Sequence, residues 1–174
     1  MIIWIMGISG SGKSTLGKFI YKKIKKEHPP TIFIDGDQFR KVFNNDIKYT
    51  LKDRDINAKR LTSFVKYFSD QKLNIIIAAN ITSPKFRRWC KKFIKNYFEI
   101  FIETPMNILK KRDYKNLYKD AFSGKITNVV GVDIPFIKPK GSNLIINNSK
   151  SKKELYSNYK MILKKVNLKK LKIY

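Results

Sequence analysis

The chain has 174 residues, enough for one domain with a hydrophobic core and little beyond it, so residues 1–174 are expected to form a single domain. Its 38 lysines and arginines against 13 acidic residues give a net charge of +25, which would suit a nucleic-acid-binding protein. However, 32 of the basic residues are lysines spread over nearly every segment, and no zinc-ligand set or aromatic–basic repeat accompanies them. The charge is therefore interpreted as a compositional bias with a general attraction for anions as its by-product, and we expect no specific nucleic-acid partner.

Neither a membrane segment nor an internal disulfide is expected. The apolar run at residues 75–79 is far shorter than a membrane span, and the apolar residues 2–6 are too few for the core of a signal peptide. Cys90 is the single cysteine, which excludes a disulfide within the chain and suits a reducing compartment. The sequence therefore predicts a cytoplasmic protein.

Apolar runs alternate with amphipathic stretches along the chain. Strands are expected at Ile2–Met6, Thr31–Asp35, Leu73–Ala79, Tyr97–Ile102 and Asn143–Ile146. Helices are expected at residues 13–26, 38–45, 54–71, 84–96, 105–112 and 152–166. The run from residue 75 to residue 79 is continuous, as in strands that are buried on both faces. Alternation of this kind predicts an α/β fold with a five-stranded parallel sheet and helices on both of its faces.

Residues 113–142 contain several glycines and prolines but no long periodic element. An ordinary surface connection is one explanation of this segment. A stretch of this length inside a compact domain is more often a functional lid, which is the interpretation we favour. The segment that follows Asn167 is expected to form either a last amphipathic turn or a frayed end.

Residues 7–14 are Gly-Ile-Ser-Gly-Ser-Gly-Lys-Ser, the complete pattern of a phosphate-binding loop between a strand and a helix. The glycines let backbone N–H groups turn toward a phosphate, and the N-terminus of the helix adds partial positive charge. Lys13 can reach the β- and γ-phosphates, and the Ser14 hydroxyl can bind Mg²⁺. We expect the contacts to a nucleoside triphosphate to come from Gly7, Ser9, Gly10, Ser11, Gly12, Lys13, Ser14 and Thr15.

Two carboxylates, Asp35 and Asp37, stand at the end of the second expected strand, with Gly36 between them. We expect this strand to be adjacent to the strand of the phosphate-binding loop, so that both carboxylates face the γ-phosphate at the carboxyl end of the sheet. There a carboxylate can accept the proton of an attacking hydroxyl or help to hold Mg²⁺ through water. Capping of the next helix by Asp37 is the alternative, and the two roles are compatible.

No carboxylate follows the strand that ends at Ala79, where an aspartate could bind Mg²⁺, and Asn80 stands there instead. The metal would therefore rest on Ser14, phosphate oxygens and water, with Asp35 or Asp37 nearby. This arrangement favours a small-molecule kinase over a motor ATPase or a GTPase. The guanine-selecting sequence Asn-Lys-x-Asp is also absent, so ATP is the expected donor.

These motifs resemble the adenylylsulfate (APS) kinase family along nearly the whole chain. The matching pieces are Gly7–Thr15, Asp35-Gly36-Asp37 with Arg40, Asp53-Arg54 with Asn57, Ser83-Pro84, Glu103-Thr104-Pro105, Lys111-Arg112-Asp113, Asn116-Leu117-Tyr118-Lys119 and Gly131-Val132-Asp133-x-Pro135. The resemblance implies the three-layer sandwich of a P-loop kinase with a lid segment. It also implies that ATP phosphorylates the ribose 3′-hydroxyl of a nucleotide whose 5′-phosphate carries a second anionic group. A homodimer is a further implication, since family members are often dimeric.

The same resemblance implies a role for each matched residue. Asp37 would be the catalytic base near the 3′-hydroxyl, Asp35 would support it, and Lys13 would act at the phosphates. Arg112 would lie near the ATP. The acceptor nucleotide would be bound by Arg40, Tyr49, Arg54, Asn57, Lys59, Ser83, Lys119 and Val129. An acceptor with two anionic groups needs several cationic partners, and exclusion of water by the lid would strengthen their attraction.

The sequence departs from the family where the acceptor's base and its outer anionic group would lie. The family stacks the adenine between two phenylalanines, whereas this chain has Tyr49 at one position and Val129 at the other. Replacing an aromatic residue by valine removes a stacking face, which is worth about 1–3 kcal/mol per base. Lys59 takes the place of an arginine and lacks the planar fork of a bidentate sulfate contact.

A pyrimidine base would need less stacking surface than adenine. The chain is similar to the branch of the family associated with capsule modification, which phosphorylates cytidine diphosphoramidate on its 3′-hydroxyl, and we favour this acceptor. The alternative is an adenylylsulfate kinase, which makes 3′-phosphoadenylylsulfate in sulfate assimilation. A nucleic-acid-binding protein with a regulatory or motor P-loop is a more distant alternative.

Overall fold

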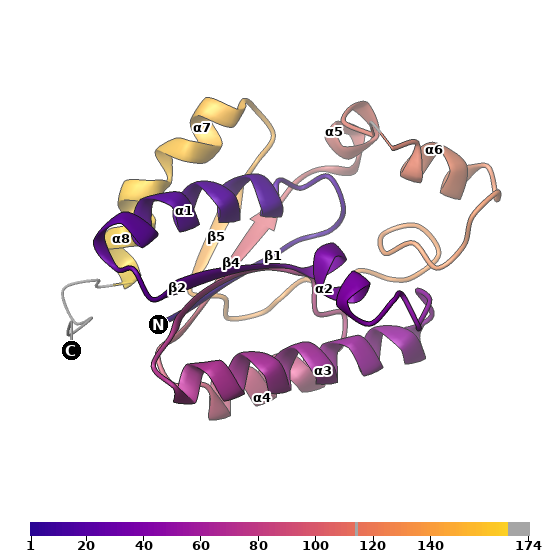
Figure 1. Cartoon of the computed structure of the whole chain (residues 1–174). Helices are drawn as coiled ribbons and strands as arrows, with labels where there is room; N and C mark the ends of the chain where they lie inside the picture. Colours follow the sequence, from indigo (N-terminus) through magenta and orange to yellow (C-terminus); the bar gives the residue numbers. More distant parts are fainter. Residues whose placement is uncertain (114, 167–174) are drawn as a thin grey trace.

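The computed structural model describes residues 1–113 and 115–166, in which five parallel strands form a sheet with the order β2-β3-β1-β4-β5 (Figure 1). The strands are β1 (Ile2–Met6), β2 (Thr31–Asp35), β3 (Asn74–Ala78), β4 (Tyr97–Glu103) and β5 (Leu144–Asn147). Every residue of β1 and of β3 is buried, which explains why their sequences are continuous rather than alternating apolar runs. β5 forms an edge of the sheet, and its residues alternate between buried and exposed.

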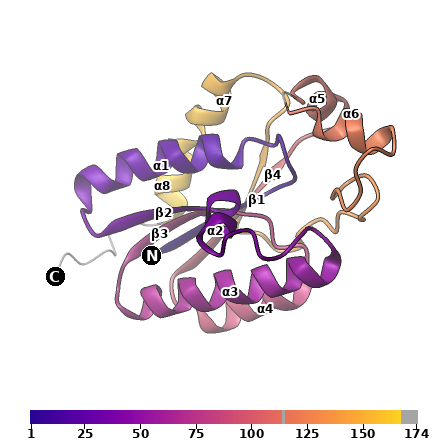
Figure 2. The same cartoon turned by 45° about the vertical axis from the view of Figure 1, so that its right-hand side comes forward.

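Helices cover both faces of this sheet and produce three layers, as Figures 1 and 2 show. The helices are α1 (Lys13–Glu27), α2 (Gly36–Val42), α3 (Leu51–Asp70), α4 (Pro84–Phe93), α5 (Met106–Lys111), α6 (Leu117–Phe122), α7 (Lys152–Ser157) and α8 (Tyr159–Val166). One apolar cluster joins α1, α7 and α8 to the sheet, and another joins α3 and α4 to its opposite face. Within the described part of the chain, none of the helices is both long and apolar enough to cross a membrane.

The lid segment, residues 113–142, projects from the carboxyl end of the sheet (Figure 1). It contains α6, and its residues Val129, Val130 and Ile134 pack with Tyr118 in an apolar cluster that also includes Ile8 of the phosphate-binding loop. The Tyr118 hydroxyl donates a hydrogen bond to the Ser9 carbonyl oxygen at 2.8 Å. The lid segment is therefore packed directly against the phosphate-binding loop.

The expected fold class is confirmed, and each of the five strands lies within one residue of its expected bounds. The helix expected at residues 152–166 is divided at Asn158, whose side-chain amide donates to the Glu154 carbonyl and competes with the helical hydrogen bonds. α3 begins at Leu51 rather than at residue 54, because Thr50 and Asp53 form a capping box before it. The segment after Asn167, for which an amphipathic turn or a frayed end was expected, lies outside the described residues.

One expectation about the sheet is wrong, since β2 is not adjacent to β1. β3 lies between them and pairs in parallel with both strands. After β1, the connection through α1 leads to β2, which is two positions away from β1 in the sheet. The later connection through α3 leads to β3, which occupies the position between them. Asp35 therefore reaches the phosphate-binding loop across β3 rather than from a neighbouring strand.

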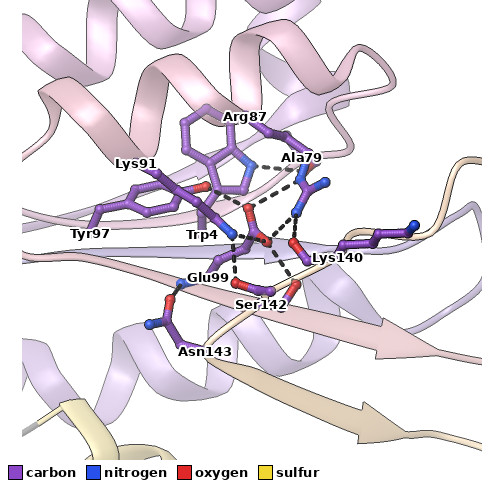
Figure 3. Close-up of polar contacts among 10 residues, drawn as sticks. Trp4, Ala79, Arg87, Lys91, Tyr97, Glu99, Lys140, Ser142 and Asn143 are labelled. Carbon is purple, nitrogen blue, oxygen red and sulfur yellow. Dashed lines mark hydrogen bonds and ion pairs between the residues drawn. The ribbon is translucent and has the colours of Figure 1, made fainter.

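A buried carboxylate lies in the middle of β4. Glu99 is fully buried, and its oxygens accept hydrogen bonds from Arg87 at 2.6 and 3.2 Å, from the Tyr97 hydroxyl at 3.1 Å and from the Ser142 hydroxyl at 2.7 Å (Figure 3). Lys91 approaches it to 3.6 Å. Burial by itself would raise the pKa of Glu99, but the hydrogen bonds from Arg87 and Ser142 outweigh burial and lower it. The carboxylate is thus held in its ionised form.

The cationic partners of Glu99 also fasten the end of the lid segment. Arg87 donates to the Lys140 carbonyl at 3.3 Å, and Lys91 donates to the Gly141 carbonyl at 2.6 Å. Two residues after Gly141, the side-chain oxygen of Asn143 accepts a hydrogen bond from the backbone N–H of Glu99 at 2.8 Å (Figure 3). Residues 140–143 are therefore attached to both α4 and β4.

Candidate active site

The phosphate-binding loop, residues 7–14, has the backbone shape that its glycines permit. Gly7 and Gly12 have φ values of 148° and 96°. A Cβ atom at Gly7 would lie 2.5 Å from Ser11 Oγ and 2.8 Å from the Ile102 carbonyl, and one at Gly12 would lie 2.7 Å from the Asn148 amide. Side chains are thus excluded at both positions, and the loop can pass close to a phosphate.

Two polar side chains brace this loop from behind. Asn148, which is buried, donates from its amide to the Ser11 carbonyl at 2.8 Å. Arg112 in turn donates to the Asn148 carbonyl at 2.9 Å and to the Lys150 carbonyl at 2.7 Å. Arg112 and Ser9 line one small cavity beside the loop, which places Arg112 where a bound nucleotide could contact it.

Asn148 was not among the site residues expected from the sequence. It follows the carboxyl end of β5, and a polar residue just beyond a strand is the same signal that singled out Asp35 and Asn80. Its partner Ser11 lies 137 positions earlier in the chain, so the contact itself had no local signature.

Lys13 is held inside the loop, where its ammonium group donates to the Ile8 carbonyl at 2.8 Å. Burial lowers the pKa of Lys13 to about 8, although Asp37 and Asp35 act in the opposite direction. A lysine that is easily deprotonated has less positive charge to offer to a phosphate above that pH.

The affinity for a nonhydrolysable ATP analogue is therefore expected to depend on pH. Between pH 7 and pH 9 the apparent dissociation constant should rise about tenfold, since one pH unit above the pKa leaves only about a tenth of Lys13 protonated before binding. Equilibrium titration across this range measures the effect. Lys13→Met should bind weakly with little pH dependence, and a wild-type affinity that stays constant from pH 7 to pH 9 would contradict the role of this ammonium group.

Asp35 connects β2 to the phosphate-binding loop. It is the N-cap of α2 and accepts the backbone N–H groups of Asp37 at 3.0 Å and Gln38 at 3.5 Å. Its other carboxylate oxygen accepts the Ser14 hydroxyl at 2.5 Å. The capping residue is thus Asp35 rather than Asp37. The Asp37 carboxylate is exposed and accepts no hydrogen bond from the described residues, which leaves it available to a substrate hydroxyl.

Two arginines and an aromatic ring form a second half of the site. The Arg40 and Arg54 guanidinium carbons lie 4.7 and 5.6 Å from the centre of the Tyr49 ring, and about half of the Tyr49 surface is exposed. Arg40 is buried and donates to the Lys48 carbonyl at 2.9 Å. Burial and the charge of Arg40 lower the pKa of Arg54. Among the described residues, no ion pair joins either arginine to a carboxylate, so an anionic ligand would be strongly attracted here.

Arg54 also touches the lid segment. Its guanidinium donates to the Asn128 carbonyl at 2.6 Å and to the Tyr49 carbonyl at 2.9 Å. The next residue of the lid segment, Val129, is buried in the apolar cluster around Tyr118, and its N–H donates to Asp133. The structure therefore brings Arg40, Tyr49 and Arg54 together with the lid backbone, while the Val129 side chain packs inside the lid.

The remaining expected acceptor residues are more dispersed. Lys59 is exposed on α3, Ser83 is the N-cap of α4, and Lys119 is exposed on α6. Asn57 is different, because its side-chain oxygen is buried without a hydrogen-bond partner. A buried acceptor in this condition is ready to bind a donor from a ligand.

The part of the chain that the structure describes contains no group of three or more histidine, cysteine, aspartate or glutamate side chains that could hold a metal ion. Ser14 of the loop and Asp35, which accepts its hydroxyl, offer two side-chain oxygens for a metal ion. This donor set suits Mg²⁺, which commonly takes one or two protein oxygens and completes its shell with phosphate oxygens and water.

Comparison with known proteins agrees with this arrangement. The family described as adenylylsulphate kinase matches residues 1–147. The chain is 38% identical to the cytidine diphosphoramidate kinase of Campylobacter jejuni over 167 residues, which cover 96% of each chain. It is 33% identical to the adenylyl-sulfate kinase of Clostridium acetobutylicum over 156 residues, 88% of this chain and 77% of that one.

A solved structure has the same fold. The adenylylsulfate kinase of Mycobacterium tuberculosis, determined in complex with AMPPNP and APS, superposes with a TM-score of 0.84 at 26% identity and covers 95% of this chain and 96% of that one. Similarity at this level extends over the sheet, the phosphate-binding loop and the lid segment.

Proposed function

The chain belongs to the adenylylsulphate kinase family and is an ATP-dependent nucleotide kinase, and on that premise we propose that it phosphorylates the ribose 3′-hydroxyl of cytidine diphosphoramidate. The product would serve the synthesis of phosphoramidate groups on a capsular polysaccharide. Two observations support this acceptor over adenylylsulfate. One is the 38% identity to the Campylobacter jejuni enzyme over nearly the full length of both chains. The other is the burial of Val129 inside the lid, which leaves Tyr49 as the stacking face for a base.

In the proposed reaction the acceptor's 3′-hydroxyl oxygen attacks the γ-phosphorus of ATP. The bond between that phosphorus and the β–γ bridging oxygen breaks, and ADP leaves. Asp37 accepts the proton of the hydroxyl, for which its exposed carboxylate is free. Lys13 and the backbone N–H groups of the phosphate-binding loop hold the β- and γ-phosphates of the donor.

Mg²⁺ is the proposed cofactor, bound by Ser14 and phosphate oxygens with Asp35 close by through water. The metal would neutralise the charge of the β- and γ-phosphates. Asp35 orients the Ser14 hydroxyl and also caps α2, so it aligns the start of α1 with the position of Asp37. Asp35 is thus a positioning residue for both the metal and the base.

The class of acceptor that we propose is inferred from one observation, the pair of arginines beside Tyr49. The Arg40 and Arg54 guanidinium groups lie over the half-exposed Tyr49 ring, and neither has a carboxylate partner in the described residues. A nucleotide whose 5′ end carries two linked anionic groups would supply a negative charge to each arginine and a base to Tyr49. A neutral sugar acceptor would leave the buried charge of Arg40 and the partly buried charge of Arg54 uncompensated.

The acceptor is tested by steady-state kinetics with ATP, Mg²⁺ and each of the two nucleotides. We expect a higher kcat/KM with cytidine diphosphoramidate than with adenylylsulfate, and a 3′-phosphorylated product by mass spectrometry. Faster turnover of adenylylsulfate would favour the second candidate, an adenylylsulfate kinase of sulfate assimilation, which the relatives with that name support. Phosphorylation at another hydroxyl would contradict the placement of Asp37.

The same proposal covers the organisation of the chain. Residues 1–174 would act as one nucleotide kinase domain, and residues 113–142 would close over both substrates as a lid. We propose a cytoplasmic location, because the reaction requires ATP. Size-exclusion chromatography with light scattering would show whether the chain forms the homodimer implied by its resemblance to the family.

A further inference from the structure

Asn80 follows the strand that lies between β1 and β2. The parallel registers align Ile5 of β1, Ala78 of β3 and Asp35 of β2 across the sheet. Asn80 comes two residues after Ala78, beyond the carboxyl end of β3. It is therefore placed at the edge of the sheet where β1 leads into the phosphate-binding loop on one side and β2 ends at Asp35 on the other.

The alternation of β3 determines which face of the sheet Asn80 occupies. Ile77, Ala79 and Ile81 belong to the cluster beneath α3 and α4. Ala78 points to the other face of the sheet. There its Cβ lies 3.4 Å from the position that a Cβ atom on Gly17 of α1 would occupy. By this alternation Asn80 is on the same face of the sheet as Ala78, the face covered by α1. The hydrogen bond from the Ser14 hydroxyl of α1 to Asp35 at the end of β2 is on this face as well.

The side-chain oxygen of Asn80 has no hydrogen-bond partner although it is buried. Nearly all buried polar atoms in folded proteins are paired, because a buried acceptor without a donor costs free energy. Packing of the protein alone thus gives no reason for an amide at this position, where Ala78 and Ala79 precede it with small apolar side chains. A donor that arrives with the nucleotide would supply the reason.

We propose that the Asn80 side-chain oxygen accepts a hydrogen bond from a water ligand of the Mg²⁺ that enters with ATP. Three protein oxygens would then surround the metal on the α1 face, namely those of Ser14, Asp35 and Asn80. The neutral amide supplies the acceptor without adding a negative charge beside Asp35 and Asp37 and the incoming phosphates. This inference rests on the proposed use of Mg–ATP and is independent of the identity of the acceptor nucleotide.

The test is the Mg²⁺ dependence of binding of a nonhydrolysable ATP analogue, measured by calorimetry without acceptor. In Asn80→Ala we expect the half-saturating Mg²⁺ concentration to rise about tenfold, as is typical when a hydrogen-bonding partner of a metal ligand is lost. The affinity for the metal-free analogue should remain near the wild-type value. Asn80→Asp should lower the half-saturating concentration, because a carboxylate binds metal-bound water more strongly. Mn²⁺ titration followed by electron paramagnetic resonance gives the same comparison directly on the metal.

Asn57→Ala is the matched control, because its side-chain oxygen is also buried and unpaired but lies on α3 in the acceptor half. This change should leave the half-saturating Mg²⁺ concentration unaltered. Should Asn80→Ala fail to fold, Asn80→Ser provides a smaller acceptor and an intermediate effect. If folded Asn80→Ala showed the Mg²⁺ dependence of the wild type, the role of Asn80 would be wrong, but the proposed Mg–ATP donor would stand. Absence of any Mg²⁺ dependence in the wild-type protein would overturn the proposed Mg–ATP donor as well.

Discussion

Asp37→Asn is expected to lower kcat by about 10²- to 10⁴-fold, the range associated with loss of a general base. The amide cannot accept the proton of the attacking 3′-hydroxyl, although its size and position match those of the carboxylate. Binding of an ATP analogue should stay near the wild-type value, since the Asp37 side chain makes no hydrogen bond within the described residues. Single-turnover kinetics and calorimetry on the same preparation measure both quantities.

Asp35→Asn is the matched comparison, because it changes the neighbouring carboxylate in the same way. This residue accepts the Ser14 hydroxyl and two N–H groups of α2, so its loss should weaken Mg–ATP binding together with turnover. A selective loss of kcat in Asp37→Asn, set against a combined loss in Asp35→Asn, separates the base from the positioning residue. If Asp37→Asn kept a kcat close to that of the wild type, Asp37 would not be the base.

Glu99→Leu is expected to produce the largest loss of stability, about 3–5 kcal/mol in the free energy of unfolding. Arg87, which is buried beside Glu99, would keep its charge and lose both hydrogen bonds to the carboxylate. The Tyr97 and Ser142 hydroxyls would lose their acceptor as well. Denaturant unfolding followed by circular dichroism measures the change.

The double variant Arg87→Met with Glu99→Leu provides the control. An apolar pair of similar volume removes the unpaired charge, so the double variant should be more stable than Glu99→Leu alone. A loss below about 1 kcal/mol in Glu99→Leu would indicate that water reaches Arg87 and replaces the carboxylate.

Local features of the sequence predicted most of the fold. β1 and β2 have the bounds expected from the sequence, and the phosphate-binding loop lies between β1 and α1 as its glycines indicated. Asp35 ends β2 and Asp37 comes two residues later, at the carboxyl end of the sheet as expected. These features depend on neighbouring residues, so a single sequence contains them.

Strand order and the closest contacts of the site could not be predicted in this way. The apolar run of β3 does not state that the strand lies between β1 and β2, because that position depends on the paths of α1 and α3. Arg54 meets the Asn128 carbonyl across 74 positions of the chain. The burial of Val129 likewise depends on Tyr118 of the lid segment and Leu109 of α5, which belong to the same apolar cluster.

The attachment of residues 140–143 to α4 and β4 has a consequence for how this family could diversify. The lid segment is a strap held at one end by Arg87, Lys91 and Glu99 and joined at the other end to α5. Exposed side chains of the strap between these anchors, such as Lys119, can be exchanged without disturbing the sheet, whereas Tyr118 and Val130 pack with Ile8 and so couple the strap to the loop that binds the donor. Acceptor preference can therefore evolve through the exposed part of the strap, while its buried part is inherited together with the phosphate-binding loop.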